Sequence, residues 1–407
     1  MSSSNLAAGL SSGCPVDSSR DERKSAALAA QRFRAEKGSL LVRTFGVARD
    51  ILRSTAMKQA GLGSDRVVVD DPTHVPVFFL DGETHRRKRA AIARFFTPKA
   101  IATRHRAVME RASDELLQEL RKNGSFYLDQ AAWRLAVIVA SEVVGLDNSR
   151  DVGMARRIEG VLGETALYGM GPLRRFFSSL LVRAQVMHFF FRDVRPTIKA
   201  RRTAPREDII SHLLEEGYSE KAILVETMTY SAAGMATTRE FIVMVAWHLF
   251  DNAAIRKRFC SGTEEDQFAI LEEILRLEPV ATLLYRRADE GLPDALKDEV
   301  SVGAVYAIDM RSANVDETAT GPCPFAIDPD RAKRMKISGS YLSFGDGPHR
   351  CPGAQVALNE TRIFIDRLFR IQGVRLAKEP RMLWNPALLS YELRDALVVC
   401  DGAPALS

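Results

Sequence analysis

The sequence predicts a mainly α-helical protein, with a large helical region, a small β-rich region and one long helix through its middle. Three observations predict this fold class. Helical periodicity dominates from about residue 85 to about residue 280, the long stretch 226–252 is apolar on nearly every side from Phe241 to Phe250, and strand-like segments are short and peripheral. The composition is that of a globular chain, with 46% hydrophobic and 27% charged residues.

The chain of 407 residues is predicted to form one domain over residues 26–407, because neither an internal repeat nor a clear linker interrupts the pattern. Residues 1–25 are rich in serine, and we expect a flexible N-terminal segment there. They contain no apolar run of the length of a signal peptide or membrane anchor, so a cytoplasmic protein is expected. The net charge of +5 is small for a nucleic-acid-binding protein, and no such partner is predicted.

The individual elements follow from local patterns. Residues 106–122 place apolar side chains three and four apart, as an amphipathic helix does, and the Pro- and Arg-rich stretch 199–208 indicates a loop. Short strands are predicted at 42–47, at 298–310 and at 396–400.

The stretch "FGDGPHRCPGA", residues 344–354, surrounds one cysteine with glycines. A thiolate that binds a metal must be deprotonated, and a flexible loop lets successive backbone N–H groups turn toward its sulfur. Gly345 and Gly347 permit the tight turn, and Gly353 lets a large flat ligand approach the backbone. The five cysteines include no CxxC pair, so one cysteine with a special role fits better than a zinc site.

The pattern Phe-Gly-x-Gly-x-x-x-Cys-x-Gly resembles the haem-binding loop of the cytochrome P450 family. The resemblance implies that haem b is the cofactor and that Cys351 is the metal ligand on its iron. It also implies that the rest of the loop binds the cofactor, with His349 at a haem propionate. The cofactor-binding residues of this loop are therefore Phe344, Gly345, His349, Cys351 and Gly353.

Three further segments match this family in its order along the chain. Glu273 and Arg276, three apart in "EEILRLEP", resemble a Glu-x-x-Arg brace beneath the haem, whose third member would be Arg334 or Lys336. His85 and Arg89, four apart on one helix, resemble a propionate clamp. The segment "YRRAD" adds Arg286 to that clamp, with Arg287 as the alternative.

The stretch "SAAGMATTRE" combines small residues with hydroxyls in the middle of the long helix. Serine and threonine can bond back to the carbonyl four residues earlier and bend a helix locally, which leaves room for a small ligand. The stretch resembles the oxygen-binding helix of the family, and the resemblance implies catalytic roles for the residues Ala233, Gly234, Thr237 and Thr238.

One position departs from the family pattern, because Ala236 stands where an acid is usual. In the family this acid and the neighbouring alcohol relay protons to dioxygen, and an alanine cannot titrate. Protons would then pass through ordered water, Thr238 or Glu240, or the reaction is atypical.

By analogy with the family, the distal pocket is lined by apolar or small residues, which fit a small apolar organic substrate. The stretch 164–177 is expected to contribute to this lining. The single residues predicted there are Val77, Phe78, Ala232, Ala233, Thr282 and Leu283.

The resemblance implies a monooxygenase that inserts one oxygen atom from dioxygen into this substrate. Its electrons are expected from NAD(P)H through a ferredoxin reductase and a ferredoxin, since the chain carries no dinucleotide or flavin motif. The alternative, favoured by Ala236, is a haem-thiolate enzyme with other chemistry: a peroxygenase, an oxidative coupling enzyme or a nitric oxide reductase. A protein that only carries or senses haem is a third hypothesis.

Overall fold

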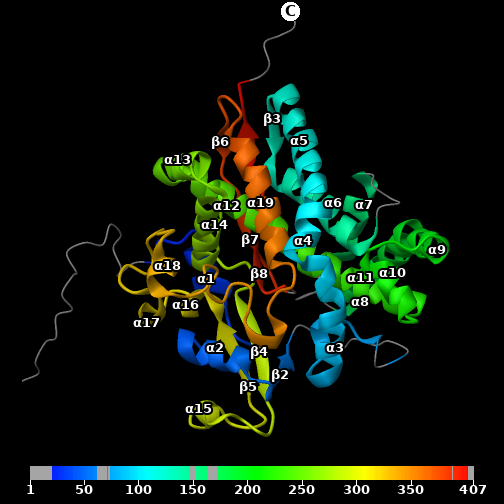
Figure 1. Cartoon of the computed structure of the whole chain (residues 1–407), viewed down its shortest axis with the longest axis vertical. Helices are drawn as coiled ribbons and strands as arrows, with labels where there is room; N and C mark the ends of the chain where they lie inside the picture. The colour runs from blue at the N-terminus through cyan, green and yellow to red at the C-terminus, as the bar shows by residue number, and fades with distance from the viewer. Residues whose placement is uncertain are drawn as a thin grey trace, which may run out of the picture.

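The computed structural model describes residues 21–61, 71, 74–146, 152–162, 172–386 and 388–401. Helices dominate, and the strands are short, as Figure 1 shows. The α-helices are α1 (Ala26–Arg32), α2 (Phe45–Arg53), α3 (Gly82–Ala93), α4 (Pro98–Ala100), α5 (Arg106–Asn123), α6 (Leu128–Val144), α7 (Val152–Leu162), α8 (Pro172–Phe189), α9 (Arg195–Thr203), α10 (Ile209–Glu215), α11 (Glu220–Tyr230), α12 (Thr237–Asp251), α13 (Ala253–Ser261), α14 (Glu264–Leu277), α15 (Asp294–Lys297), α16 (Met310–Ala313), α17 (Glu317–Thr320), α18 (Arg331–Met335) and α19 (Ala354–Phe369).

Shorter 3-10 and π-helical turns join several of these helices. The 3-10 turns are η3 (Val77–Phe79), η4 (Arg94–Phe96) and η10 (Gly347–His349), and the π-helical turns are η5 (Ile101–His105), η8 (Phe190–Val194) and η9 (Ser231–Ala236).

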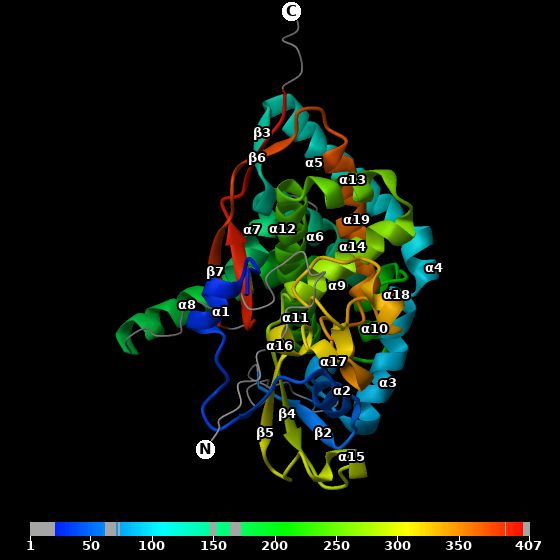
Figure 2. The ribbon, with the colours of Figure 1, turned by 90° about the vertical axis from the view of Figure 1, so that its left-hand side faces the viewer.

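The predicted long helix exists as one continuous run formed by α11, η9 and α12. Its second half is apolar on nearly every side from Phe241 to Phe250 and lies in the main hydrophobic core, where Val243, Val245 and Leu249 are fully buried. The helices α5, α6 and α19 contribute the surrounding side chains of that core, and Figures 1 and 2 show them grouped around α12. A helix without a polar face is stable only in such a position.

The helices around this core begin and end where local chemistry allows. α5 buries the apolar stripe that its sequence predicted and ends at Gly124, which takes the left-handed conformation at φ 72°. α14 starts with a capping box, in which the side chains of Thr263 and Asp266 bond each other's backbone N–H groups. The capping box fixes where α14 begins, and the C-terminal part of this helix carries Glu273 and Arg276.

The strands form three small sheets, which agrees with the predicted β-rich region. The largest has the order β1-β5-β4-β2 and comprises β1 (Leu40–Val42), β2 (Met57–Ala60), β4 (Leu283–Ala288) and β5 (Val305–Asp309). The others pair β3 (Ser125–Tyr127) with β9 (Leu397–Val399) and β6 (Arg375–Lys378), and β7 (Arg381–Asn385) with β8 (Ser390–Arg394).

Two of the element predictions need correction. The predicted strand 42–47 ends at Val42, because Thr44 starts α2 and Phe45 and Ala48 pack inward from that helix. The predicted loop 199–208 begins only after α9 ends at Thr203.

The last residues of the predicted N-terminal segment contact the rest of the molecule. Arg23 and Ser25 are buried, and the Arg23 guanidinium donates to the carbonyl of Arg311 at 2.7 Å. Residues 1–20 of the predicted flexible segment lie outside the described residues. Within the part of the chain that the structure describes, no helix has the length and apolar character needed to cross a membrane.

Candidate functional site

The loop around Cys351 is closed by its own backbone. The N–H of Cys351 donates to the carbonyl of Phe344 at 2.8 Å, and the backbone N–H groups of Gly353 and Ala354 point to the sulfur. Burial raises the pKa of the Cys351 thiol, while these amides and the neighbouring arginines Arg89 and Arg350 act in the opposite direction. The predicted orientation of N–H groups toward the sulfur is therefore present.

The glycines of this loop have different roles. Gly345 and Gly347 lie at φ 69° and 63°, which few other residues adopt. A Cβ on Gly347 would lie 2.4 Å from the carbonyl oxygen of Leu52, so α2 can approach the loop only because this residue is glycine. A Cβ on Gly353 would meet no atom within 4 Å, which leaves open space beside the sulfur.

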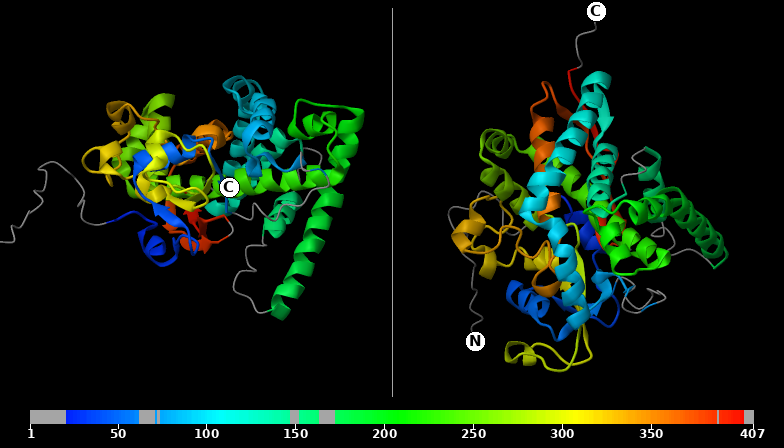
Figure 3. Two further views of the ribbon diagram at one scale, coloured as in Figure 1. Left: turned by 90° about the horizontal axis from the view of Figure 1, so that it is seen from below. Right: turned by 45° about the vertical axis from the view of Figure 1, so that its right-hand side comes forward.

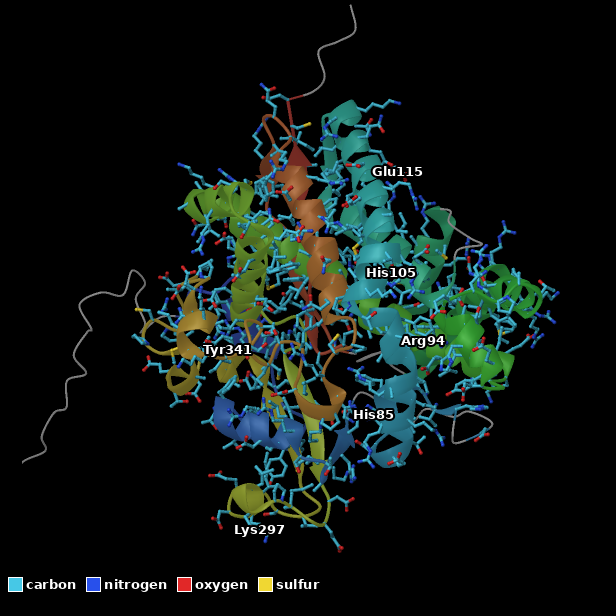
Figure 4. The ribbon with its side chains drawn as sticks, in the orientation of Figure 1. His85, Arg94, His105, Glu115, Lys297 and Tyr341 are labelled. Carbon is cyan, nitrogen blue, oxygen red and sulfur yellow. The ribbon has the colours of Figure 1, made fainter. Side chains whose placement is uncertain are left out.

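Basic and imidazole side chains from three segments gather near the loop. His85 of α3 stacks on His349 with ring centroids 4.1 Å apart, and Figure 4 labels His85 on α3 beside the Cys loop. Arg89, one turn later, donates to the carbonyl of Arg350. Arg286 enters from β4, and it is only 3% exposed.

The charges of these groups affect one another. Burial, aided by the charges of His349, Arg89 and Arg286, lowers the pKa of His85 to about 4. Burial lowers the pKa of Arg286 to about 10, and the carboxylate of Asp81 opposes that shift. His349 Nε2 lies 3.0 Å from Asp81 Oδ1. The Asp81 carboxylate therefore faces three of these side chains, His85, Arg286 and His349, and the cluster, which also contains Arg89, can accept further negative charge.

The central helix, the continuous run formed by α11, η9 and α12, carries an accessible patch. Ala233 and Gly234 are exposed and Thr237 is half-buried, although their neighbours Met235 and Ala236 are buried. The hydroxyls of Thr237 and Thr238 donate to the carbonyls of Ala233 and Gly234, each at 2.6 Å, within and next to the π-helical turn η9. The predicted back-bonding is confirmed, and it accompanies a widened turn of the helix.

Arg89 connects the two sides of the site. Its charge interacts with the Cys351 thiol from the loop and with the Tyr230 phenol from the central helix, one turn before Ala233. The cysteine loop and the accessible patch of the helix therefore border one region of the molecule.

The predicted brace forms below the loop. Arg276 donates to both carboxylate oxygens of Glu273, at 2.8 and 2.7 Å. The third member is Arg331, whose Nε donates to Glu273 Oε1 at 3.0 Å and whose side chain is 1% exposed.

Neither predicted third member takes this position. Arg334 is exposed and pairs with Asp328, and Lys336 ends α18 in the left-handed conformation at φ 52°. The reason is the short helix α18, which begins at Arg331 and turns the residues after it toward solvent.

The comparisons with known proteins agree with this geometry. The family model for cytochrome P450 matches residues 268–382, the part that contains the brace, β4 and the cysteine loop. Among curated relatives, cytochrome P450(MEG) of Priestia megaterium is 24% identical and the match covers 77% of this chain and 76% of the relative. Cytochrome P450 107B1 of Saccharopolyspora erythraea is 28% identical, with 79% and 76% covered. The crystal structure of CalO2 superposes with a TM-score of 0.75 at 20% identity, covering 90% of this chain and 92% of that one.

The chain belongs to the cytochrome P450 superfamily. The fold is the P450 fold, with its helical region and small β region. The chain is therefore a P450 monooxygenase, an oxidoreductase whose cofactor is haem b.

The residues of this P450 fit that cofactor. Cys351 is accessible, and yet burial raises the pKa of its thiol. A sulfur that is reached from a recess inside the molecule has both properties. Open space lies beside both Gly353 of the loop and Gly234 of the helix, where a Cβ would meet nothing within 4 Å. The side chains of His85, Arg89, Arg286 and His349, here called the cationic cluster, offer partners to two propionate groups. A thiolate, two glycine-lined walls and a cluster of cations match an anionic porphyrin.

The predicted substrate residues differ in how exposed their side chains are. Ala232 and Phe78 are half-buried, Ala233 is exposed, and Val77 is 8% exposed in an apolar cluster next to α11. The stretch 164–177 is not tested, because residues 163–171 lie outside the described residues.

Thr282 and Leu283 both contact other parts of the protein, and their place in the substrate pocket stays a prediction. The Thr282 hydroxyl donates to the carbonyl of Leu389 at 2.7 Å and is occupied there. Leu283 packs with Tyr285 and Ala307 on one face of β4, whereas the side chains alternate along a strand. Leu284 is therefore the residue that faces the cysteine loop: it lies 3.9 Å from the Cβ position of Gly345.

Sequence reasoning missed Asp81 and left Arg286 and Arg287 as alternatives. Arg286 is buried near Asp81 and Arg287 is exposed, since successive residues of β4 point to opposite faces. Asp81 is the N-cap position of α3, four residues before His85, and that position was the available signal.

Glu240 is excluded as an open proton donor, because its carboxylate accepts from Arg239, from Arg394 and from the N–H of Leu393.

Proposed function

We propose that this P450 inserts one oxygen atom from dioxygen into a small apolar organic substrate, with Cys351 as the ligand of the haem iron. Haem bound through a thiolate supplies the activation of dioxygen and the oxidation of an unactivated C–H bond. The single observation that carries the proposal is the accessible patch of Ala233, Gly234 and Thr237 in an otherwise buried helix, bordering the same region as Cys351.

The chain's own residues have distinct tasks in this proposal. The amides of Gly353 and Ala354 stabilise the thiolate, since N–H dipoles offset its charge. His85, Arg89, Arg286 and His349 hold the two propionates and so fix the orientation of the porphyrin. Ala233 and Gly234 leave space for dioxygen, and the Thr237 hydroxyl holds a proton at the edge of that space.

The electron supply is part of the proposal. We expect electrons from NAD(P)H through a ferredoxin reductase and a ferredoxin, because the chain carries no dinucleotide-binding or flavin-binding motif. Location in the cytoplasm also stays a prediction.

A screen of apolar compounds against the purified haem protein tests the substrate class. A ligand that enters the accessible patch displaces water from the haem and shifts its absorption. Each ligand found is then incubated with a surrogate ferredoxin, a ferredoxin reductase and NADPH, and the expected product carries one added oxygen atom derived from ¹⁸O-labelled dioxygen. Products without the label would contradict the proposal.

Ala236 favours a second function. Its side chain is 4% exposed, lies in an apolar cluster and has no acidic group that could donate a proton. The candidates are oxidation driven by hydrogen peroxide, oxidative coupling without oxygen insertion, and nitric oxide reduction. Turnover with peroxide alone, or consumption of NADH that depends on nitric oxide, would favour this alternative. A haem carrier or sensor would consume no reducing equivalents with any donor.

A further inference from the structure

A buried acid and a phenol lie on the central helix just before the accessible patch. Glu226 and Tyr230 are four residues apart in α11, so they share one side of that helix, and Ala233 follows Tyr230 by one turn. Glu226 is 2% exposed, and its Oε2 atom is enclosed without a hydrogen-bond partner. The Tyr230 hydroxyl is also enclosed, and it interacts with this carboxyl group although the two make no hydrogen bond of ordinary geometry. Buried polar atoms without partners are uncommon and often mark functional groups.

The groups that interact with Glu226 come from α3, η3, α11 and the segment before α11. Lys88 of α3 is its cationic neighbour, the N–H of Val77 in η3 donates to it, and Tyr230 lies on its own helix. The phenol of Tyr218, in the segment before α11, interacts electrostatically with the Glu226 carboxyl group. Lys88 lies 4.9 Å from the centroid of the Tyr218 ring and donates to the carbonyl of Val75 at 2.8 Å.

The carboxyl group of Glu226 changes its charge near neutral pH. Burial raises the pKa of Glu226 to about 7, although Lys88, the Val77 amide and the Tyr230 hydroxyl each act to lower it. The phenols of Tyr218 and Tyr230 both have raised pKa values, because they are buried beside this carboxyl group. The two tyrosines therefore keep their protons, while Glu226 can release and regain one.

Tyr230 leads from this acid toward the candidate site. Arg89 interacts with Tyr230 and with the Cys351 thiol, so the phenol lies on the side of α11 that faces the site. Beyond it, Gly234 borders open space that can hold water, and Thr237 follows. Ala236, the position of the usual acid, is packed among apolar side chains and has no proton to give.

We propose that Glu226, acting through Tyr230, stores the proton that this P450 delivers to its oxygen chemistry in place of an acid at position 236. The inference rests on the proposed function. In the transfer, the O–H bond of Glu226 breaks and its proton moves to the Tyr230 oxygen. The phenol releases its own proton on the other side, through water beside Gly234 to Thr237. No electron moves. Glu226 is left as a carboxylate beside the Lys88 ammonium until solvent returns a proton.

The experiment compares haem-loaded wild type with Glu226→Gln, Tyr230→Phe and the control Glu220→Gln. Glutamine keeps the shape of Glu226 but cannot release a proton. Glu220 lies on the same helix, where it is paired with Arg202 and Arg195. Two measurements are made: an infrared titration of protonated carboxyl groups, and dioxygen consumption with a surrogate ferredoxin, ferredoxin reductase and NADPH in H₂O and D₂O.

The infrared titration does not depend on turnover. We expect a carboxylic acid band that disappears with a midpoint near pH 7, that is absent in Glu226→Gln, and that Glu220→Gln and Tyr230→Phe retain. If no band that titrates in this range is lost in Glu226→Gln, the proposal is overturned. Should Glu226→Gln fail to fold, Glu226→Asp must shift the midpoint of the same band, and an unchanged midpoint contradicts the proposal.

Dioxygen consumption tests the relay. We expect Glu226→Gln and Tyr230→Phe each to lower the rate by about tenfold or more, which is the lower range for loss of a proton-transfer group, and Glu226→Gln to lose the pH dependence. Glu220→Gln should match wild type. A wild-type rate and pH profile in Glu226→Gln, or a wild-type rate in Tyr230→Phe, overturns the relay. If wild type itself consumes no dioxygen with these donors, the proposed function fails, and the infrared titration still decides whether Glu226 holds the proton.

Discussion

At the scale of single residues, Cys351 is the exposed member of the three free thiols within the described residues. We predict that Cys351→Ala abolishes the absorption spectrum that reduced, thiolate-bound haem gives with carbon monoxide, because no other described thiol borders the cationic cluster. Cys260→Ala, which removes a half-buried free thiol elsewhere, should leave that spectrum unchanged. A normal carbon monoxide spectrum in Cys351→Ala would refute the assignment.

Thr237 and Thr238 make the same back-bond, but only Thr237 is accessible. We predict that Thr237→Ala raises the share of consumed dioxygen that leaves as hydrogen peroxide, because the hydroxyl next to the open space is lost. The matched variant Thr238→Ala should keep the wild-type peroxide yield, since Thr238 is 5% exposed and borders the core. Peroxide per dioxygen is measured in both, and an equal yield in Thr237→Ala and wild type would show that protons bypass Thr237.

Glu360 makes the folding stability depend on pH. Burial alone raises its pKa to about 8, and its Oε1 has no hydrogen-bond partner. The unfolded chain ionises this carboxyl near pH 4.5, so the folded state binds the proton more tightly. Its contribution is therefore full below about pH 4.5 and is lost as the pH rises to about 8.

We predict that Glu360→Gln flattens this dependence and makes the protein relatively more stable at high pH, by up to about 5 kcal/mol between these limits. Urea unfolding of both proteins at a series of pH values measures the difference. Parallel curves for the two proteins would contradict the raised pKa.

At the scale of elements, the brace shows how a short helix decides which arginine is structural. Arg331, at the start of α18, bonds Glu273 and also donates to the carbonyls of Thr320 and Cys323. Arg334, one turn later, reaches only the surface carboxylate of Asp328. A buried ion pair that loses one partner leaves an uncompensated charge, whereas an exposed pair contributes little.

We therefore predict that Arg331→Ala lowers the free energy of unfolding by about 3 to 5 kcal/mol and reduces haem retention. Arg334→Ala should cost less than about 1 kcal/mol. Chemical denaturation and the haem content after purification measure both effects. Equal costs for the two variants would mean that the triad is not the support of the loop.

At the scale of the whole molecule, the sequence predicted what depends on short spacing. The cysteine loop, the Glu273–Arg276 pair and the run from α11 to α12 are each specified by residues within one or a few turns. The geometry it left open or missed joins distant segments. Asp81 and His349 are 268 residues apart, and the spacing of side chains in one segment carries no information on which other segment packs against it.

The same reason applies to single side chains. Leu283 and Leu284 are equally apolar, and only the pairing of β4 with β5 and β2 decides which one faces the cysteine loop. Glu226 resembles a surface glutamate in sequence, because its burial depends on α3 and η3, which lie far away in the chain.

The N-terminal segment gives a final case of distant packing. Arg23 donates to the carbonyls of Arg311 and Leu277, and Ser25 accepts from Arg311 Nε at 2.9 Å. This contact ties the start of the described chain to α16 and to the end of α14, the helix that carries the brace. Removing the guanidinium would leave buried carbonyls without a donor.

We predict that Arg23→Ala lowers the free energy of unfolding by about 1 to 3 kcal/mol, the cost of unsatisfied buried groups. Arg32→Ala, which removes an exposed arginine at the end of α1, should change it by less than about 0.5 kcal/mol. Urea denaturation monitored by circular dichroism and by the haem absorption should report one transition for Arg23→Ala. If Arg23→Ala behaves like Arg32→Ala, the segment rests on the molecule without stabilising it.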